Sequence, residues 1–382
     1  MPSYFLFSAP IASSAAKQPP GLCAKMTARP SEAEGWIMRR LALIAGLLIL
    51  ASGCQDKATP PAAPPDLVEN LIAGREAFDR GDFDQALVLL NKPAANDGCR
   101  KSADYFIGRI HELRGNYDEA LTAYQAAIDL PLDMNSGGGV YPELTAMARI
   151  HTARGDLAEA EELLERATNN IWALFSRHSE PSIDSGFANI SLALGDLAAA
   201  EGTARAALAE QDRRYIDDDY AEWFEDCIPL DRTLGHICLS RGDTVQAREW
   251  FSKAYDFSDK YIGRHATALD YANLALVALA AGDMDLAESH NDEALAICEE
   301  FGLKPSLAKC YVIRGMIARS RHDYAATRDW YTKAADLFNI MGCNVDAERL
   351  REFLSRLEAD PMSDYDSRKL RSDKAESNSD PE

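Results

Sequence analysis

Histidines and carboxylates are the residue types in this sequence that are most able to do chemistry. The seven histidines form no H-E-x-x-H motif, which is the spacing of a helical zinc site. His111 and His151 stand at equivalent places of a repeating pattern and could form a metal pair on neighbouring helices. No other ligand type shares their register, so we predict no metal site and no cofactor.

Two loops carry further candidate chemistry. "NSGGGV" (135–140) is rich in glycine but lacks the Gly-Lys-Ser/Thr with which a phosphate loop holds a nucleotide. "IDDDY" (216–220) offers carboxylates for calcium but lacks the spaced glycine and glutamate of an EF-hand. We interpret these loops as a flexible insert and a solvated acidic loop, and we predict no catalytic residue. An enzyme with a site in the inserts at 131–140 or 211–229 stays an alternative that requires converging titratable groups.

The cysteines beyond the N-terminal region contain no C-x-x-C pair, which argues against a zinc or thioredoxin-like site. Cys298 and Cys310 flank a turn between two expected helices. Packed helices lie ~8–10 Å apart, whereas the Cα atoms of a disulfide lie ~4.4–6.8 Å apart. We therefore predict that both residues are buried free thiols; the alternative is a disulfide, which export would permit and which requires both side chains on the facing sides of the two helices.

Cys54 differs from the other cysteines because it ends the segment "MRRLALIAGLLILASGC" (38–54). Two arginines precede an apolar run from Leu41 to Ala51, which is shorter than the ~20 residues that span a bilayer and suits a signal peptide. The end of the segment resembles a bacterial lipobox. The resemblance implies that Cys54 is lipidated and becomes the mature N-terminus. A plain secretory signal and a buried apolar helix are the alternatives.

The signal-peptide interpretation also predicts where the protein starts and which residues form the signal peptide. Residues 1–37 show no helical period, and we expect them to lie outside the translated or mature protein, with Met38 as the start. The alternative is that Met1 begins an extended N-terminal region. Residues 38–53 are the predicted signal peptide.

A Pro-rich tether, "CQDKATPPAAPPD", is predicted at 54–66, where its prolines make an extended spacer. Gln55 follows the lipobox cysteine in the place where an aspartate marks inner-membrane retention in many double-membrane bacteria. The resemblance therefore implies a lipid-anchored protein of the cell envelope, on the periplasmic face of the outer membrane.

A phrase like "GNYDEA" recurs through the rest of the chain. In each copy a glycine that can end one helix precedes an aspartate or asparagine that can cap the next helix. Only the last copy departs from this pattern, with His322 in place of glycine. Self-similarity at this period indicates a solenoid of helix hairpins. The copies begin at residues 81, 115, 155, 195, 242, 282 and 322.

Three further positions of the repeat carry small residues in nearly every copy, and we call each such set of equivalent positions a column. Small side chains let packed helices approach closely. Pro93 and Thr327 are the exceptions. The columns are Gly74, Gly108, Ala148, Ala188, Gly235, Ala275 and Gly315; Ala86, Ala120, Ala160, Ala200, Ala247 and Ala287; and Ala127, Ala167, Ala207, Ala254, Ala294 and Ala334.

The combined pattern resembles the tetratricopeptide repeat family over about residues 67–342. The resemblance implies an all-α fold, an α-solenoid in the form of a right-handed superhelix. We expect about seven helix hairpins and a C-terminal capping helix at 344–357, because terminal repeats need a cap. The predicted solenoid domain is 67–357, and residues 358–382 are predicted to be a disordered acidic tail.

The same resemblance implies that the first helices line a concave groove that binds a peptide. Two repeat positions that face the groove carry a polar and partly basic series here, and arginine suits carboxylates. We predict that the groove holds an extended peptide, such as an acidic segment or a C-terminus; a solvated face is the alternative. The series is Tyr105, Arg109, Thr145, Arg149, Ser185, Asn189, Arg232 and His236.

The last two units are apolar at these positions, with Ala272, Leu276, Val312 and Met316. They either pack under the capping helix or offer a helix-binding site. The formal net charge of −21 disfavours a nucleic-acid partner. We therefore predict a non-catalytic, lipid-anchored scaffold or adaptor that binds a protein. The main alternative is a regulatory repeat module of the cytoplasm.

Overall fold

The computed structural model describes residues 65–131, 139–175, 180–214 and 227–359. Within these ranges the chain folds into α-helices joined by turns, with one π-helical segment, which confirms the predicted all-α solenoid. Cys54, the signal peptide, nearly all of the tether and of the acidic tail, and most of both inserts lie outside the described residues.

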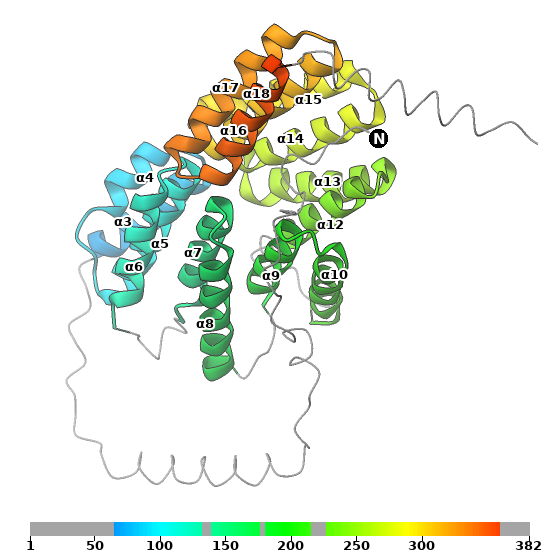
Figure 1. Ribbon diagram of the computed structural model, residues 1–382. Helices are drawn as coiled ribbons and strands as arrows, with labels where there is room; N and C mark the ends of the chain where they lie inside the picture. Colours follow the sequence, from blue (N-terminus) through cyan, green and yellow to red (C-terminus); the bar gives the residue numbers. More distant parts are fainter. Residues whose placement is uncertain (1–64, 132–138, 176–179, 215–226, 360–382) are drawn as a thin grey trace, which may run out of the picture. The chain divides into compact units, whose positions relative to one another are not determined.

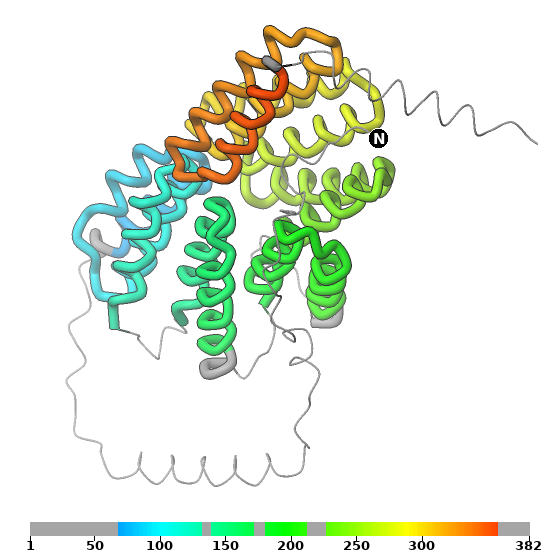
Figure 2. The backbone as a smooth tube through the Cα atoms, in the orientation of Figure 1, coloured from blue at the N-terminus to red at the C-terminus, as the bar shows by residue number. Residues whose placement is uncertain are grey.

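The described helices form seven hairpins, which we number as units one to seven, each with a first and a second helix (Figure 1). The backbone trace passes from each hairpin to the next (Figure 2). The units are α3 (Pro65–Asp79) and α4 (Phe83–Leu90); α5 (Asp97–Leu113) and α6 (Tyr117–Asp129); α7 (Tyr141–Arg154) and α8 (Leu157–Phe175); α9 (Pro181–Ala193) and α10 (Leu197–Arg214); α12 (Ile228–Ser240) and α13 (Thr244–Phe257), continued by η2 (Ser258–Ile262); α14 (Arg264–Ala281) and α15 (Met284–Phe301); α16 (Lys304–Ser320) and α17 (Tyr324–Ile340). Helix α18 (Asn344–Ala359) follows at the place of the predicted cap.

The turn inside each hairpin has the backbone that its glycine predicts. A left-handed residue ends the first helix and releases the chain into the second. His322 takes this conformation in unit seven with φ of 62°, so the turn is kept although the glycine is lost. The other units have φ of 82° at Gly81, 69° at Gly115, 87° at Gly155, 80° at Gly195, 81° at Gly242 and 85° at Gly282.

The predicted capping of the second helices is confirmed in four units and wrong in two. The side-chain oxygens of four cap residues accept from the backbone N–H three residues further along the chain, at Asp196, Asp243, Asp283 and Asp323. In unit one, Asp82 instead accepts from Arg80. In unit two, Asn116 accepts from Lys304, which comes from unit seven. A partner outside the hairpin has replaced the cap in that unit.

The small-residue columns pack as predicted. Every alanine of the second and third columns is at least 96% buried, and Thr327 is completely buried. In the first column, a Cβ added at Gly108 would lie 2.5 Å from the Tyr124 ring, and one at Gly235 would lie 2.6 Å from the Phe251 ring. These glycines therefore make room for a large side chain of the second helix in the same unit.

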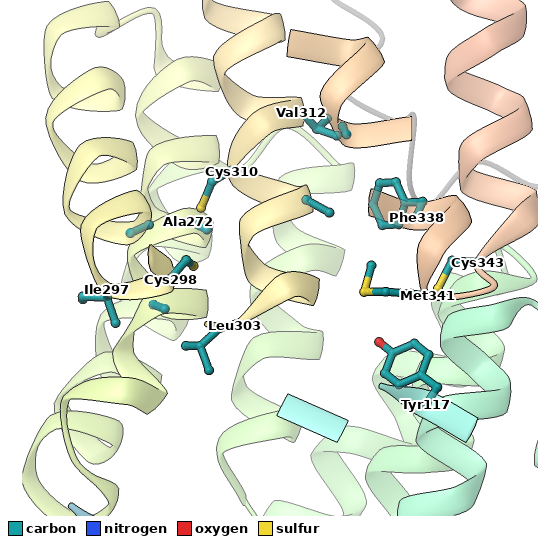
Figure 3. Packing of buried hydrophobic residues seen from close by; sticks show 14 of the residues in the cluster. Tyr117, Ala272, Ile297, Cys298, Leu303, Cys310, Val312, Phe338, Met341 and Cys343 are labelled. Carbon is teal, nitrogen blue, oxygen red and sulfur yellow. The ribbon is translucent and has the colours of Figure 1, made fainter. Parts of the chain in front are cut away.

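The largest apolar cluster joins residues of units one to three with residues of units six, seven and α18. Figure 3 shows Tyr117 of α6 beside Met341 and Cys343, which follow α17. The apolar positions of units six and seven belong to this cluster: Ala272, Val312 and Met316 are buried, and Leu276 packs against them. Phe353 and Leu354 of α18 pack on the same cluster. The apolar positions of units six and seven were predicted either to pack under the capping helix or to bind a helix. Packing is the alternative that the structure shows.

Contacts between distant units join turns inside the early hairpins to the connections between the late hairpins, and we call this set of contacts the seam. Lys304 donates to Asn116 at 2.7 Å, and the Arg154 Nε donates to the Met341 carbonyl at 3.4 Å. Gly81 lies against the ring of Phe301. Repeat proteins are held together mainly by neighbouring repeats, so a contact between units five apart is an additional constraint.

Candidate functional site

The predicted polar series lies on the first helices of four consecutive units, and we call it the first-helix row. Its members are Tyr105 and Arg109 on α5, Thr145 and Arg149 on α7, Ser185 and Asn189 on α9, and Arg232 and His236 on α12. Six of the eight side chains are partly exposed. The hydroxyls of Thr145 and Ser185 are buried and donate to carbonyls of their own helices at 2.7 and 2.8 Å, which leaves them little capacity for a ligand.

Arg149 forms a two-pronged ion pair with Glu112 of the preceding unit, at 2.9 and 3.0 Å. Tyr124 donates to the same carboxylate at 2.6 Å. Burial alone would raise the pKa of Glu112, but the charges of Arg149 and Arg109 and the hydrogen bonds from Arg149 and Tyr124 together outweigh burial and lower it. Glu112 therefore stays ionised, and the pair bridges α5 and α7.

A second bridge joins units five and six. Arg232 donates to both carboxylate oxygens of Asp270 at 2.7 Å, and Asp270 is completely buried. The same guanidinium donates to the Ser258 hydroxyl at 3.2 Å. Between units four and five, Thr233 donates to the Asn189 side-chain oxygen at 2.9 Å. Three members of the first-helix row are thus engaged in holding neighbouring units together.

Sequence reasoning missed these partners. Glu112 precedes Arg149 by 37 residues and Asp270 follows Arg232 by 38, close to one repeat period. The signal that could have found both pairs is a pair of opposite charges about one repeat period apart on successive first helices.

Arg109 and His236 keep a different environment. The Arg109 guanidinium lies 5.9 Å from the ring centres of Phe78 and Tyr105, within the range of a cation–π interaction. The His236 ring packs edge-on against Phe251 at 5.0 Å. Burial, assisted by the charges of Lys309 and Arg232, lowers the pKa of His236 well below its usual value. His236 is therefore neutral near pH 7.

Lys309 on α16 is a functional candidate that the sequence did not suggest. Its amine donates to the side-chain oxygen of Asn273 on α14 at 2.6 Å. Burial, reinforced by the charge of Arg232, lowers the pKa of Lys309 to about 8. This amine is mostly protonated at pH 7.

Among the described residues, no group of three or more His, Cys, Asp or Glu side chains is placed to hold a metal ion. His111 lies on α5 and His151 on α7, where the His151 Nδ1 is 3.6 Å from Asp156. Cys298 and Cys310 are buried free cysteines, and the interaction with Cys310, together with burial, raises the pKa of the Cys298 thiol. A search of the described helices for a segment long and apolar enough to cross a membrane finds none.

Helix hairpins, left-handed turns and small-residue columns define this protein as an α-solenoid of two-helix repeats. Three models of the family described as "Tetratricopeptide repeat" match the sequence, at residues 73–135, 144–166 and, in two overlapping matches, 226–300 and 266–340. Together these matches cover more than half of the chain. The chain belongs to the tetratricopeptide repeat family.

Three solved structures are similar to this chain at low sequence identity. A Rap protein, in a crystal structure with competence and sporulation factor, has 15% identity and a TM-score of 0.50, covering 82% of this chain and 90% of that chain. The quorum sensor NprR from B. thuringiensis has 12% identity and a TM-score of 0.40, covering 85% and 94%. PilF from Pseudomonas aeruginosa has 16% identity and a TM-score of 0.35, covering 68% and 99%.

A comparison with curated proteins gives no match. The family identity supports a protein-interaction module, and the repeat matches cover parts of units one to three and units five to seven. The first-helix row is the candidate for the surface that such a module uses.

Proposed function

We propose that this protein is a lipid-anchored adaptor of the bacterial cell envelope that binds a protein or peptide through its first-helix row. The observation that carries the proposal is the row itself, in which polar, partly exposed side chains stand on the first helices of consecutive units. A partner lying along these helices would meet one set of polar groups from each unit.

Two features support an extended polypeptide as the partner. Successive first helices repeat the same positions, so a chain with its own regular spacing can contact several units. The Rap protein with the same fold was crystallised with competence and sporulation factor, which is a precedent for a bound factor in this architecture. Hydrogen bonds from arginine and asparagine suit the carbonyls and carboxylates of such a chain.

The anchoring part of the proposal rests on the sequence of residues 38–66. An apolar segment that ends in a lipobox-like "LASGC" and continues into a Pro-rich tether suits a domain held at a distance from a membrane surface. We place this domain at the periplasmic face of the outer membrane because Gln55, and not an aspartate, follows Cys54.

The binding proposal is tested by charge reversal on two faces of the solenoid. Arg109→Glu should reduce capture of crosslinked partners from the envelope fraction strongly. Arg248→Glu is the matched control, because Arg248 is an exposed arginine on the second helix α13. Circular dichroism should show the same helical content in both variants. Equal capture by both variants would remove the first-helix row from consideration.

The anchoring proposal has an independent test. Cys54→Ser should move the protein from the membrane fraction to the soluble periplasmic fraction, because this substitution removes the proposed site of lipid attachment. The intact mass of the wild-type N-terminal peptide should include the lipid. An unmodified peptide that begins at Met1 or Met38 would contradict the anchor while leaving the binding proposal in place.

A further inference from the structure

Two buried cysteines face each other across the connection between units six and seven. Cys298 lies near the end of α15 and Cys310 in the first half of α16, and both are equally far from Lys304 in the sequence. Both side chains are completely buried in the largest apolar cluster. Figure 3 shows them pointing toward each other. The structure therefore places both side chains on the facing sides of the two helices, which is what a disulfide between packed helices requires.

The two thiols are unreactive once they are packed. The interaction with Cys310, together with burial, raises the pKa of the Cys298 thiol. A thiol has to lose its proton before it can attack a disulfide, so the packed pair reacts slowly with an oxidant. The two cysteines are close in the sequence, so they meet early in folding, while their thiols are still open to water. Oxidation of the pair is therefore expected during folding and not after it.

The segment between the two cysteines carries two contacts of the seam. The Phe301 ring lies against Gly81, and its centre is 6.3 Å from the centre of the Phe83 ring in unit one. Lys304 donates to Asn116 of unit two at 2.7 Å. A covalent bond that closes this segment would restrict its movement and so hold both contacts in place.

We propose that Cys298 and Cys310 form a disulfide that holds the connection between α15 and α16 against units one and two. This inference goes beyond the proposed function and depends neither on the partner nor on the lipid anchor. It adds a site of covalent modification that stabilises the seam.

The oxidant is a compound that itself carries a disulfide, such as oxidised glutathione. The thiolate of one cysteine attacks this disulfide and displaces one thiol, which leaves a mixed disulfide. The thiolate of the other cysteine then attacks the mixed disulfide and displaces the second thiol. The two cysteines are oxidised to one disulfide, the oxidant is reduced to two thiols, and the protons of the cysteines end on those thiols. An oxidising compartment preserves such a bond.

Refolding of the full-length protein tests whether the bond forms. The protein is unfolded in urea and refolded with a mixture of oxidised and reduced glutathione. Its free thiols are then alkylated under denaturing conditions, and the digested protein is analysed by mass spectrometry. We expect a peptide pair that links Cys298 to Cys310, with Cys238 and Cys343 alkylated. Alkylation of both Cys298 and Cys310, or a link from either one to another cysteine, would overturn the proposal.

The reactivity of Cys343 tests whether the bond acts on the seam. Cys343 is buried beside Tyr117 of unit two, so a thiol reagent reaches it when the seam opens (Figure 3). Cys343 should be labelled about tenfold more slowly in the oxidised protein than in protein refolded with reduced glutathione alone. Cys238, which is buried in a different apolar cluster, is the control and should be labelled at the same rate in both forms. Equal rates at Cys343 in the two forms would overturn the proposed effect on the seam.

A double variant separates the bond from the packing of the two side chains. Cys298→Ala/Cys310→Ala keeps small apolar side chains at both positions but cannot form the bond. In this variant Cys343 should be labelled at the same rate after refolding in either glutathione buffer, and about as fast as in the reduced wild type. A variant in which oxidised glutathione still slows the labelling of Cys343 would show that the effect arises elsewhere, and would overturn the proposal.

Discussion

The seam between distant units makes a prediction that compares two glycines of the same backbone conformation. Gly115 and Gly282 both end a first helix with positive φ, 69° and 85°. A Cβ added at Gly115 would lie 2.7 Å from the Met341 sulfur and 3.1 Å from the Lys304 Cβ, whereas one at Gly282 meets nothing within 4 Å. Alanine is strained at both sites, but it collides with another unit only at Gly115.

The magnitudes follow from these two contributions. Left-handed strain costs about 1–2 kcal/mol for alanine at either position. Overpacking adds about 1–3 kcal/mol at Gly115, since Met341 is 98% buried and has little space into which to move. We expect Gly282→Ala to lower the free energy of unfolding by about 1–2 kcal/mol and Gly115→Ala by about 2–5 kcal/mol.

Urea unfolding followed by circular dichroism measures both variants, and a double-mutant cycle with Met341→Ala isolates the collision. Removing the methionine should abolish most of the extra cost of Gly115→Ala, because the two sites are in contact. Equal losses at Gly115 and Gly282, or no coupling with Met341, would refute the seam.

Two further predictions concern buried charges. Burial, partly offset by Arg349, raises the pKa of Asp346 to about 6. A raised folded-state pKa gives stability that is complete below about pH 4 and is lost as the pH rises through about 6. Asp346→Asn should therefore stabilise the protein at pH 7.5 by at most about 3 kcal/mol and have little effect at pH 3.5, as thermal unfolding at both pH values can check; the same shift at both would contradict the titration. Glu112→Gln should cost about 3–5 kcal/mol in urea unfolding, because it leaves Arg149 partly buried without an anion. Glu112→Leu/Arg149→Met should recover most of that loss, and a double variant as unstable as the single one would contradict a simple ion-pair bridge.

Within the described residues, the local rules of the repeat were predictable from the sequence. The left-handed turn and the small columns depend on residues within one unit, so each copy of the repeat carries its own signal. His322 shows the limit of the rule, since the conformation is retained without the glycine. The sequence pattern identified the hairpins because packing inside a hairpin is a short-range property.

Features that join distant units were not predictable in the same way. Asn116 looked like a helix cap, but its oxygen accepts from Lys304, a residue 188 positions away. The series of arginines looked like a free binding surface, yet Arg149 and Arg232 are paired with carboxylates of adjacent units. Sequence spacing placed these side chains on successive first helices, but their pairing depends on the distance between those helices.

Photo-crosslinking in intact cells tests the central claim of a partner on the first-helix row most directly. A photoreactive amino acid is placed at Arg109 and at His236 on first helices, and at Arg248 and at Lys333 on second helices. The account predicts that one partner polypeptide is crosslinked from both first-helix positions and from neither second-helix position. Crosslinks that arise only from the second-helix positions, or equally from all four, would contradict it.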